Sequence, residues 1–298
     1  MTSVTASADG LPRKRNVGSL ERQRRWALRG SYAALSFFVV IFLIPPFYMI
    51  MTSLKSSAEI SAQQGNPWIA QNPTFDNFVY LATNPNFQRF FFNSVWVTGS
   101  VVILSMTIAI LAAFSLSRLG FKGSQVISTG VFLTYLVPPS LLFIPLFQIV
   151  GTLGLINNTW VLVLLFPTLA VPFCTWIMIG YFSSIPRELD EAALIDGASY
   201  LQILLRVFIP VAMPGIIAAT IFAFTVGWGA FLYPLAYLYS ADQAVLTIGI
   251  VRELIRGDVF AWGTIMAACV MGAAPPIIIY TFLMDYYVAG LTAGATKG

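Results

Sequence analysis

The chain has 298 residues, 58% hydrophobic and only 9% charged, which excludes a water-soluble globular domain, because such domains average about 25% charged residues. The mean hydropathy of +0.80 shows that most of the chain is apolar, which is enough for about six membrane-spanning helices of some 20 residues each. The chain has no histidine and so lacks the commonest general base and zinc ligand. The net charge of +4 is concentrated in the first 29 residues, so it indicates membrane orientation rather than nucleic-acid binding.

The N-terminal residues 1–29 are rich in Ser, Thr, Gly and Arg and lack hydrophobic periodicity, which predicts a mobile cytoplasmic tail. The apolar stretch from about Ser31 to Leu54 is too long for a signal-peptide core of about 7–15 residues. We expect it to stay in place as a first span. Residues 55–92 then turn polar and irregular, which predicts an external loop.

Five further uncharged stretches predict spans at about 93–117, 126–149, 159–182, 211–239 and 261–284. The expected fold is therefore an all-α, polytopic membrane protein with six transmembrane helices. With the basic tail inside, the predicted inside segments hold 12 of the 16 Lys and Arg residues. This bias follows the positive-inside rule and predicts that both termini are cytoplasmic.

The predicted spans carry no Asp, Glu, Lys or Arg well inside them. Ion-coupled carriers need such groups for their relays and ion sites, so we expect the energy source to lie elsewhere. The spans do contain helix breakers, namely Pro138, Pro139, Pro145, Pro167, Pro172, Gly227, Gly229, Pro234, Pro275 and Pro276. Broken helices can line a cavity in a membrane, which favours a bent pathway; simple kinks in packed helices are the alternative.

The most informative segment is residues 183–215, SSIPRELDEAALIDGASYLQILLRVFIPVAMPG. A helix is predicted to start near Pro186, which suits the first turn. Three carboxylates then complement the positive end of the helix dipole: Glu188, Asp190 and Glu191. A stripe of small and apolar residues follows: Leu189, Ala192, Ala193 and Ile195.

A sharp turn and a second helix are predicted next. Gly197 supplies a left-handed stop, and Ser199 with Gln202 three residues later forms a capping box. Four residues of the second helix fall at i, i+3, i+4 and i+7 and predict one apolar face: Leu201, Leu204, Leu205 and Phe208.

This helix–turn–helix segment is too polar to span a membrane and too apolar to be left in water. Its alanines allow another protein to approach closely, and its carboxylates offer charge pairing around the rim, which favours a docking element. The alternative is an amphipathic loop on the membrane interface. Such helices favour Lys and Arg on the polar face, whereas this one carries carboxylates.

The sequence EAALIDGA, with Val207 ten residues after Gly197 and Ile209-Pro210 closing the run, resembles the EAA loop of bacterial ABC importer permeases. The stretches YFSSIPRELDEAA, NSVWVTG, SLSRLGFKG, VPPSLLFIPLFQIVGTLGLINNTW and GLTAGATKG resemble the second permease subunit of maltose-type sugar importers. The resemblance covers residues 30–298. It implies one six-span permease domain with a cytoplasmic coupling loop at 183–213 and external loops at 55–92 and 240–260.

The resemblance implies a bacterial inner-membrane sugar importer. Its other parts would be a second homologous permease subunit, an ABC ATPase dimer and an external solute-binding protein. The chain has no GxxxxGKS or GxxxxGKT phosphate loop, so it is not expected to bind ATP itself. ATP and Mg would belong to the partner ATPase, and this chain would have no cofactor, no catalytic residue and no nucleic-acid partner. Its two cysteines, Cys174 and Cys269, lie apart in apolar runs and predict no metal site.

The resemblance implies ATPase contacts at eight positions: Glu188, Leu189, Glu191, Ala192, Ala193, Asp196, Gly197 and Ala198. Aromatic residues crowd the fifth predicted span. Because their faces can stack on sugar rings, the pathway candidates are Phe224, Trp228, Phe231 and Tyr233. Trp228 stands out among them because two glycines leave space beside it. Packing against lipid or other helices is the commoner use of such aromatic residues.

The external segment 240–260 resembles in position the family loop that reaches toward the binding protein, which implies contacts at four charged residues: Arg252, Glu253, Arg256 and Asp258. A solvated charged loop is the alternative. The sequence also departs from the family, because Gly227-Trp228-Gly229-Ala230-Phe231 stands where a Trp-Asn pair and an acidic residue are common. The polar side chains expected to contact a sugar there are missing.

Two rival functions stay open. The first is an ABC permease for a non-sugar solute such as a peptide, a polyamine or glycerol phosphate, although an anionic solute would favour basic groups facing the pathway. The second is an ion-coupled carrier or channel, which would need an intramembrane charge. A membrane enzyme is the weakest reading, because the chain offers neither histidine nor paired carboxylates within the spans for acid–base chemistry.

Overall fold

A computed structural model describes residues 17–62, 66–256 and 259–295. The chain divides into two compact units, residues 1–49 and 50–298. The first unit contains most of helix α1, which runs from Val17 to Ser53.

The helical start of α1 corrects the predicted tail, because residues 17–29 are helical. Leu, Glu, Arg, Gln and Ala dominate this stretch, and their high helix propensity outweighs its lack of hydrophobic periodicity. The guanidinium of Arg29 also lies 5.7 Å from the ring centre of Trp26, within range of a cation–π contact.

Five helical segments of the described chain are long and apolar enough to cross a membrane: Arg22–Ser53, Pro85–Arg118, Trp160–Ser184, Met213–Tyr237 and Trp262–Met284. Helices α5 (Ser124–Tyr135) and α6 (Pro139–Thr152) add a sixth if the pair is one span. Strand structure within the described ranges is limited to two strands of two residues each. The predicted all-α membrane fold is confirmed.

The third predicted span is not a straight helix, because α5 and α6 meet at an angle of 95°. Pro138 and Pro139 cause this break. A proline disfavours helical geometry in the residue before it and cannot donate a backbone hydrogen bond, so α5 ends at Tyr135 and Pro139 opens α6. The pair is a broken span or a re-entrant loop.

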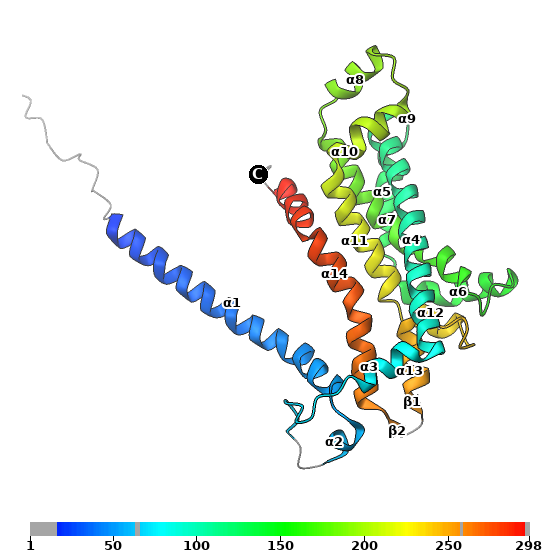
Figure 1. Ribbon diagram of the computed structural model, residues 1–298. Helices are drawn as coiled ribbons and strands as arrows, with labels where there is room; N and C mark the ends of the chain where they lie inside the picture. The colour runs from blue at the N-terminus through cyan, green and yellow to red at the C-terminus, as the bar shows by residue number, and fades with distance from the viewer. Residues whose placement is uncertain (1–16, 63–65, 257–258, 296–298) are drawn as a thin grey trace, which may run out of the picture. The chain divides into compact units, whose positions relative to one another are not determined.

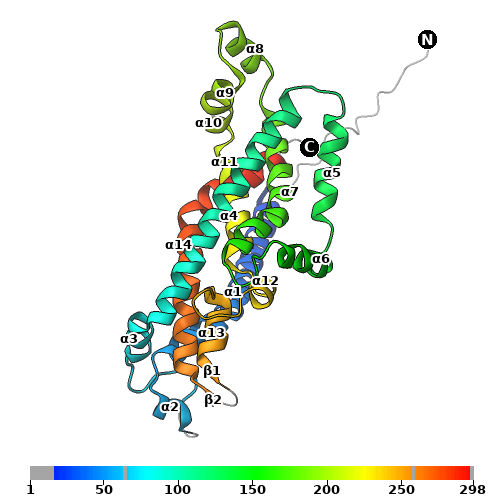
Figure 2. The same cartoon turned by 90° about the vertical axis from the view of Figure 1, so that its right-hand side faces the viewer.

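The second unit is built around helices α4 (Pro85–Arg118), α7 (Trp160–Ser184) and α11 (Met213–Trp228), which pack against one another. Helix α14 (Trp262–Ala295) runs along α11, and α5 packs on α7 (Figures 1 and 2). Three short helices lie at one end of this unit: α8 (Glu188–Ile195), α9 (Tyr200–Ile203) and α10 (Ile209–Val211) (Figure 1). Three others lie at the opposite end: α2 (Ser57–Ser61), α3 (Asp76–Thr83) and α13 (Leu246–Leu254). We call these the α8 end and the α13 end.

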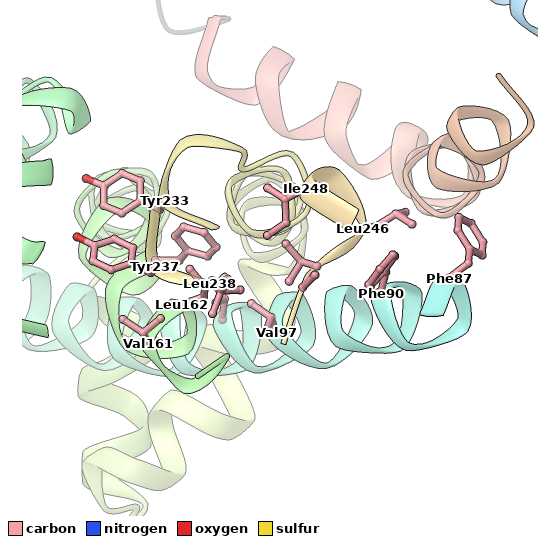
Figure 3. Close-up of a cluster of buried hydrophobic side chains, with 14 of the residues drawn as sticks. Phe87, Phe90, Val97, Val161, Leu162, Tyr233, Tyr237, Leu238, Leu246 and Ile248 are labelled. Carbon is pink, nitrogen blue, oxygen red and sulfur yellow. The ribbon is translucent and has the colours of Figure 1, made fainter. Parts of the chain in front are cut away.

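Two buried hydrophobic clusters hold the second unit together. The cluster nearer the α13 end joins α4, α7 and α12 (Leu232–Tyr237) (Figure 3), and its members include Phe90, Val97, Leu162, Tyr237 and Ile248. The cluster nearer the α8 end includes Phe114, Met178, Phe182, Phe208 and Ala219. Between membrane-spanning helices such clusters stabilise mainly through close van der Waals packing, because lipid tails are as apolar as these side chains.

The predicted external loop at 55–92 is shorter and more ordered than expected. It contains α2 (Ser57–Ser61) and α3 (Asp76–Thr83), and α4 already begins at Pro85. The side chain of Asn84 accepts hydrogen bonds from the backbone N–H groups at the start of α4. An asparagine cap followed by proline at the first helical position is therefore a helix start, not a continuation of the loop.

The side chain of Asn77 ties this region to the bundle. Its Nδ2 donates to the carbonyl oxygens of Ser53 and Lys55, at 2.9 Å each, and its Oδ1 accepts from the hydroxyl of Thr264 on α14 at 3.0 Å. The ammonium group of Lys55 is buried and donates to the carbonyl oxygens of Asn66 and Pro67. Hydrogen bonds from polar side chains thus hold residues 53–77 together and attach them to α14.

The segment predicted as an external loop at 240–260 contains a packed helix. Helix α13 (Leu246–Leu254) buries Leu246, Ile248 and Leu254. Strand β1 (Ile255–Arg256) then pairs antiparallel with β2 (Val259–Phe260). Residues Leu246–Leu254 are therefore a helix and not a loop, and this helix packs on α4 and α14.

Candidate functional site

The predicted helix–turn–helix geometry is present at the α8 end. Helix α8 (Glu188–Ile195) ends at Gly197, which has φ +81°. The N–H of Gly197 donates to the carbonyl of Leu194, and the N–H of Ala198 donates to that of Ala193, at 3.0 Å each. This is the bond pattern of a Schellman cap, which needs a left-handed residue and favours glycine.

The predicted capping box is also confirmed. The hydroxyl of Ser199 accepts from the N–H of Gln202, and the side chain of Gln202 accepts from the N–H of Ser199 at 2.8 Å. This reciprocal pair opens α9 (Tyr200–Ile203). The turn between α8 and α9 is therefore fixed by backbone hydrogen bonds on the α8 side and by side chain–backbone hydrogen bonds on the α9 side.

The predicted apolar face of the second helix is wrong in register. Leu201 and Leu205 are exposed, whereas Ile203, Leu204 and Phe208 are buried. The chain forms a π-helical turn, η1, over Leu204–Phe208 before α10 (Ile209–Val211). A π turn bonds residues five apart, so the residues four and five before Phe208 join it in the core, and the residue three before it faces outward.

Arg118, at the end of α4, connects the segment to the bundle. Its Nη1 lies 3.4 Å from Oδ2 of Asp190 on α8, and the two side chains are 5% and 18% exposed. Its Nη2 donates to the carbonyl oxygens of Phe182 and Ile185 at the end of α7. The guanidinium also lies 4.8 Å from the ring centre of Phe208. One side chain thus binds α7, α8 and η1 at once.

Sequence reasoning missed this role of Arg118. A basic residue in the last turn of a helix complements the helix dipole, and this is the one local signal that marked it. Its partners lie far along the chain and are not predicted by any motif. The aromatic rings behind it reinforce the joint, because Phe208 packs edge to face on Phe114 and Phe182, with ring centres 5.1 and 5.3 Å apart.

The eight predicted ATPase-contact residues are accessible to different degrees. Ala193 and Ala198 are half-buried against the core. The other six are exposed: Glu188, Leu189, Glu191, Ala192, Asp196 and Gly197. Further large apolar side chains are exposed on α8, α9 and η1, and with Leu189 they form what we call the docking face: Leu189, Leu194, Ile195, Tyr200, Leu201 and Leu205.

The docking face is the side of the segment that Arg118 does not hold. Ile195 is 87% exposed, although a large apolar side chain gains about 1.5–3 kcal/mol when it is buried. Contiguous exposed apolar residues with a charged rim mark interaction surfaces. The segment therefore has an inner side bonded to the bundle and an outer side suited to bind another protein.

The pathway candidates Phe224, Trp228, Phe231 and Tyr233 do not all face outward. Tyr233 is 4% exposed, and its hydroxyl donates to the carbonyl of Pro139 on α6 at 2.8 Å. Tyr237, one turn later, donates to the carbonyl of Phe143 at 3.3 Å. These two tyrosines fasten α12 to α6. Phe231, in contrast, is 43% exposed.

Trp228 is half-buried between helices. Its Nε1 donates to the carbonyl of Gly272 on α14 at 3.0 Å. That carbonyl lacks its usual helical donor, because the residue four positions later is Pro276, which has no N–H. The Trp228 ring also stacks on Phe224 at 5.7 Å and meets Phe91 edge to face at 5.9 Å.

The expected open space beside Trp228 is absent at Gly227. A Cβ atom there would lie 3.2 Å from the Cα of Thr98 on α4. Gly227 is therefore a point of close helix approach, which a glycine permits. Among the described residues, no group of three or more His, Cys, Asp or Glu could hold a metal ion.

At the α13 end, two of the four predicted binding-protein contacts can be placed. Arg252 is half-buried and donates to the carbonyl of Leu235 at 3.2 Å. Glu253 lines a pocket of about 390 Å³ together with Asp76, Asn77, Tyr80, Leu254, Ala261 and Thr264. Asp258 and the side chain of Arg256 lie outside the described residues.

Polar contacts fix the neighbouring turn at residues 240–245. The Nδ2 of Asn93 donates to the carbonyl oxygens of Asp242 and Ala244 at 2.9 Å each. Hydrogen bonds from the side chains of Ser240 and Gln243 lower the pKa of the exposed Asp242 carboxyl. The bonds of Asn93 therefore hold this turn to α4.

These features belong to a membrane permease. Residues 105–292 match the family described as binding-protein-dependent transport system inner membrane component, and the chain belongs to this family.

Curated relatives match over most of their length. The chain is 34% identical to the inner membrane ABC transporter permease protein YcjP of Escherichia coli (strain K12), over 90% of this chain and 96% of that protein. It is also 34% identical to the sulfoquinovosyl glycerol transport system permease protein SmoH of Agrobacterium fabrum, over 90% and 93% of the two chains. The trehalose/maltose transport system permease protein MalG of Thermococcus litoralis is 32% identical, over 87% and 93%.

The fold also matches a solved structure. The crystal structure of a bacterial ABC transporter involved in the import of the acidic polysaccharide alginate contains a chain that superposes with a TM-score of 0.79. The match covers 89% of this chain and 98% of that chain, at 23% sequence identity. It establishes the permease fold for this protein.

Proposed function

We propose that this chain is the membrane-spanning subunit of an ATP-driven, binding-protein-dependent importer of sugars. It would form half of the translocation pathway beside a second, homologous permease subunit. Two of its relatives are named for sulfoquinovosyl glycerol and for trehalose and maltose, and another is named for diacetylchitobiose uptake. The absence of charged residues well inside the spans supports a neutral solute over an anionic one.

One observation carries the coupling part of this proposal. The helix–turn–helix segment has an exposed docking face, and Arg118 binds its inner side to α4 and α7. A partner protein that seats on the docking face and moves would move Asp190, Arg118 and the ends of two spans together. We assign this face to the ABC ATPase dimer.

The segment would then convert closure of the ATPase dimer into a change of access in the membrane. Contacts that differ between two states of the partner shift the equilibrium between inward-facing and outward-facing permease. The outer apolar side chains supply buried area, and the exposed carboxylates Glu188, Glu191 and Asp196 would pair with basic groups around the rim.

The chain itself is proposed to be a transport subunit and not an enzyme. It carries no phosphate-loop sequence, so ATP and Mg would be bound and used by the partner subunits. No cofactor is proposed for this chain. The α8 end and both termini would lie in the cytoplasm of a bacterium, because the predicted inside segments carry 12 of the 16 basic residues.

The opposite, α13 end would receive the external binding protein. We propose Arg252, Glu253, Arg256 and Asp258 as contacts there, with Glu253 contributing through the pocket that it shares with Asp76. Among the pathway candidates, Phe224 and Phe231 are proposed to offer ring faces to the sugar. Trp228 and Tyr233 would build the wall behind them, because their polar atoms already bond to α14 and α6.

Purification of the tagged chain from gently solubilised native membranes, with mass spectrometry of its partners, tests this proposal. We expect a phosphate-loop ATPase, a second permease and an external binding protein to copurify. The solute released from that binding protein should be a neutral sugar. A chain that purifies without an ATPase would contradict the coupling assignment, and a bound peptide or polyamine would contradict the sugar assignment alone.

A further inference from the structure

Two hydroxyl groups meet between two membrane-spanning helices. The Oγ1 of Thr225 on α11 lies 2.6 Å from the phenolic oxygen of Tyr280 on α14. Thr225 is central in the span Met213–Tyr237, and Tyr280 lies within the span Trp262–Met284, four residues before its end. Thr225 is exposed and Tyr280 is half-buried. Polar groups at this depth are costly in lipid and are typical of pathways and helix contacts.

The hydrogen bonding of the pair leaves capacity for a ligand. The Oγ1 of Thr225 also lies 2.8 Å from the carbonyl oxygen of Ile221, and a threonine hydroxyl has one proton. If Thr225 donates to Ile221, then Tyr280 donates to Thr225 and its own oxygen can accept. If Thr225 donates to Tyr280, the phenolic proton is free to be donated. In both arrangements Tyr280 can form one further hydrogen bond with a ligand.

This property suits a ligand group that can both donate and accept, such as a sugar hydroxyl. It can bind Tyr280 in either arrangement, whereas a carboxylate or a phosphate accepts only. Helix α11 carries no charged residue, and neither does α14 over Trp262–Met284, so neither of these stretches offers a charged partner to an anion. A polyhydroxylated, neutral ligand fits both facts.

An aromatic wall adjoins the pair. The ring of Phe224 stacks on Trp228 with an interplanar angle of 12° and meets the ring of Tyr280 edge to face at 6.2 Å. The N–H of Trp228 is already bonded to Gly272, so Trp228 adds apolar surface and the hydroxyl pair adds polarity. Binding sites for small polar molecules combine such apolar walls with a few placed polar groups.

We propose that Thr225, Tyr280 and the ring of Phe224 form a subsite that holds a neutral sugar within the membrane-spanning part of the pathway. This inference rests on the proposed sugar import and names its contact residues. The subsite supplies, from α11 and α14, the polar contact that is missing at residues 227–231.

Variants that remove only the hydroxyl groups test the proposal. Thr225→Val and Tyr280→Phe keep the shape of each side chain. Thr281→Val is the matched control, because Thr281 is also exposed on α14 and its hydroxyl bonds to Ile277 within the same helix, at 2.7 Å. The copurified complex with its binding protein is reconstituted in liposomes with ATP. Uptake of radiolabelled trehalose, maltose and diacetylchitobiose is then measured.

We expect the maximal uptake rate to fall about fivefold in each hydroxyl variant, which corresponds to about 1 kcal/mol. The double variant should fall little further, because the two groups act as one unit. Thr281→Val should transport as the wild type does. Subunit composition and ATP hydrolysis without the binding protein should stay unchanged in all variants.

Uptake in both hydroxyl variants equal to that of Thr281→Val would overturn the subsite and leave sugar import standing. Loss of the second permease from either variant would also overturn it, since the pair would then be a packing contact. If the wild-type complex imports none of the three sugars, the proposed function fails together with the subsite.

Discussion

The ion pair between Arg118 and Asp190 offers the sharpest mutational test of the structure. Asp190→Ala leaves the guanidinium of Arg118, which is 5% exposed, without its counter-charge. Breaking a buried pair costs about 3–5 kcal/mol. Asp190 is 18% exposed, and Arg118 keeps its bonds to two carbonyl oxygens. We therefore expect the attachment of α8 to the bundle to be weakened by less than that, by ~2 kcal/mol. That loss raises the population of detached α8 by a factor on the order of 30.

Hydrogen exchange of the backbone amides of α8, measured on the detergent-solubilised protein, reports this detachment. Glu191→Ala is the matched control. It removes a carboxylate from the same first turn of α8, so both variants lose the same favourable interaction with the helix dipole. We expect exchange up to thirtyfold faster in Asp190→Ala, in keeping with ~2 kcal/mol, and little change in Glu191→Ala. Equal exchange in both variants would refute the role of the Arg118–Asp190 ion pair in holding α8.

Three further results are expected. Gly197→Leu should abolish transport, whereas Gly154→Leu should not. Both glycines have positive φ and open space, so each substitution costs about 1–2 kcal/mol of backbone strain. Only Gly197→Leu distorts the turn between α8 and α9. Equal transport in the two variants would refute this. Glu191→Lys should reduce the amount of ATPase that copurifies with the chain. An amount equal to that of the wild type would contradict charge pairing at this residue. Trp228→Phe loses the bond to Gly272 and should lower the free energy of unfolding by about 1 kcal/mol; unchanged thermal unfolding would contradict that bond.

Local signals in the sequence were sufficient where the structure is governed by neighbouring residues. The stop at Gly197 and the capping box of Ser199 and Gln202 were predicted correctly, because a cap is built from residues within a few positions of one another. The positions of the spans followed from composition in the same way.

The predictions failed where packing between distant parts of the chain decides which residues are buried and how a span bends. The 3.6-residue period placed Leu201 and Leu205 on the buried face, but the π turn before α10 changes which residues align. The Pro138-Pro139 break was visible in the sequence, but its 95° angle was not, because α5 packs on α7 and α6 is bonded to α12, both far along the chain. The helix start at Pro85 was missed because residues 55–92 were predicted as one polar and irregular loop.

The contacts that matter most for the proposed mechanism join residues far apart in the chain. Arg118 binds the end of α7 and the first turn of α8, and Thr225 meets Tyr280 on another helix. A single sequence contains no local pattern for such pairs. They become visible when α4, α7, α11 and α14 are packed together.

Uptake of sugar by the reconstituted complex, with and without ATP, tests the central claim most directly. Liposomes that contain the copurified complex would be supplied with its binding protein and with radiolabelled trehalose, maltose and diacetylchitobiose. The account predicts uptake that requires both ATP and the binding protein and that is lost in Gly197→Leu. Uptake that continues without ATP, or that survives Gly197→Leu unchanged, would contradict the coupling of this permease to a separate ATPase.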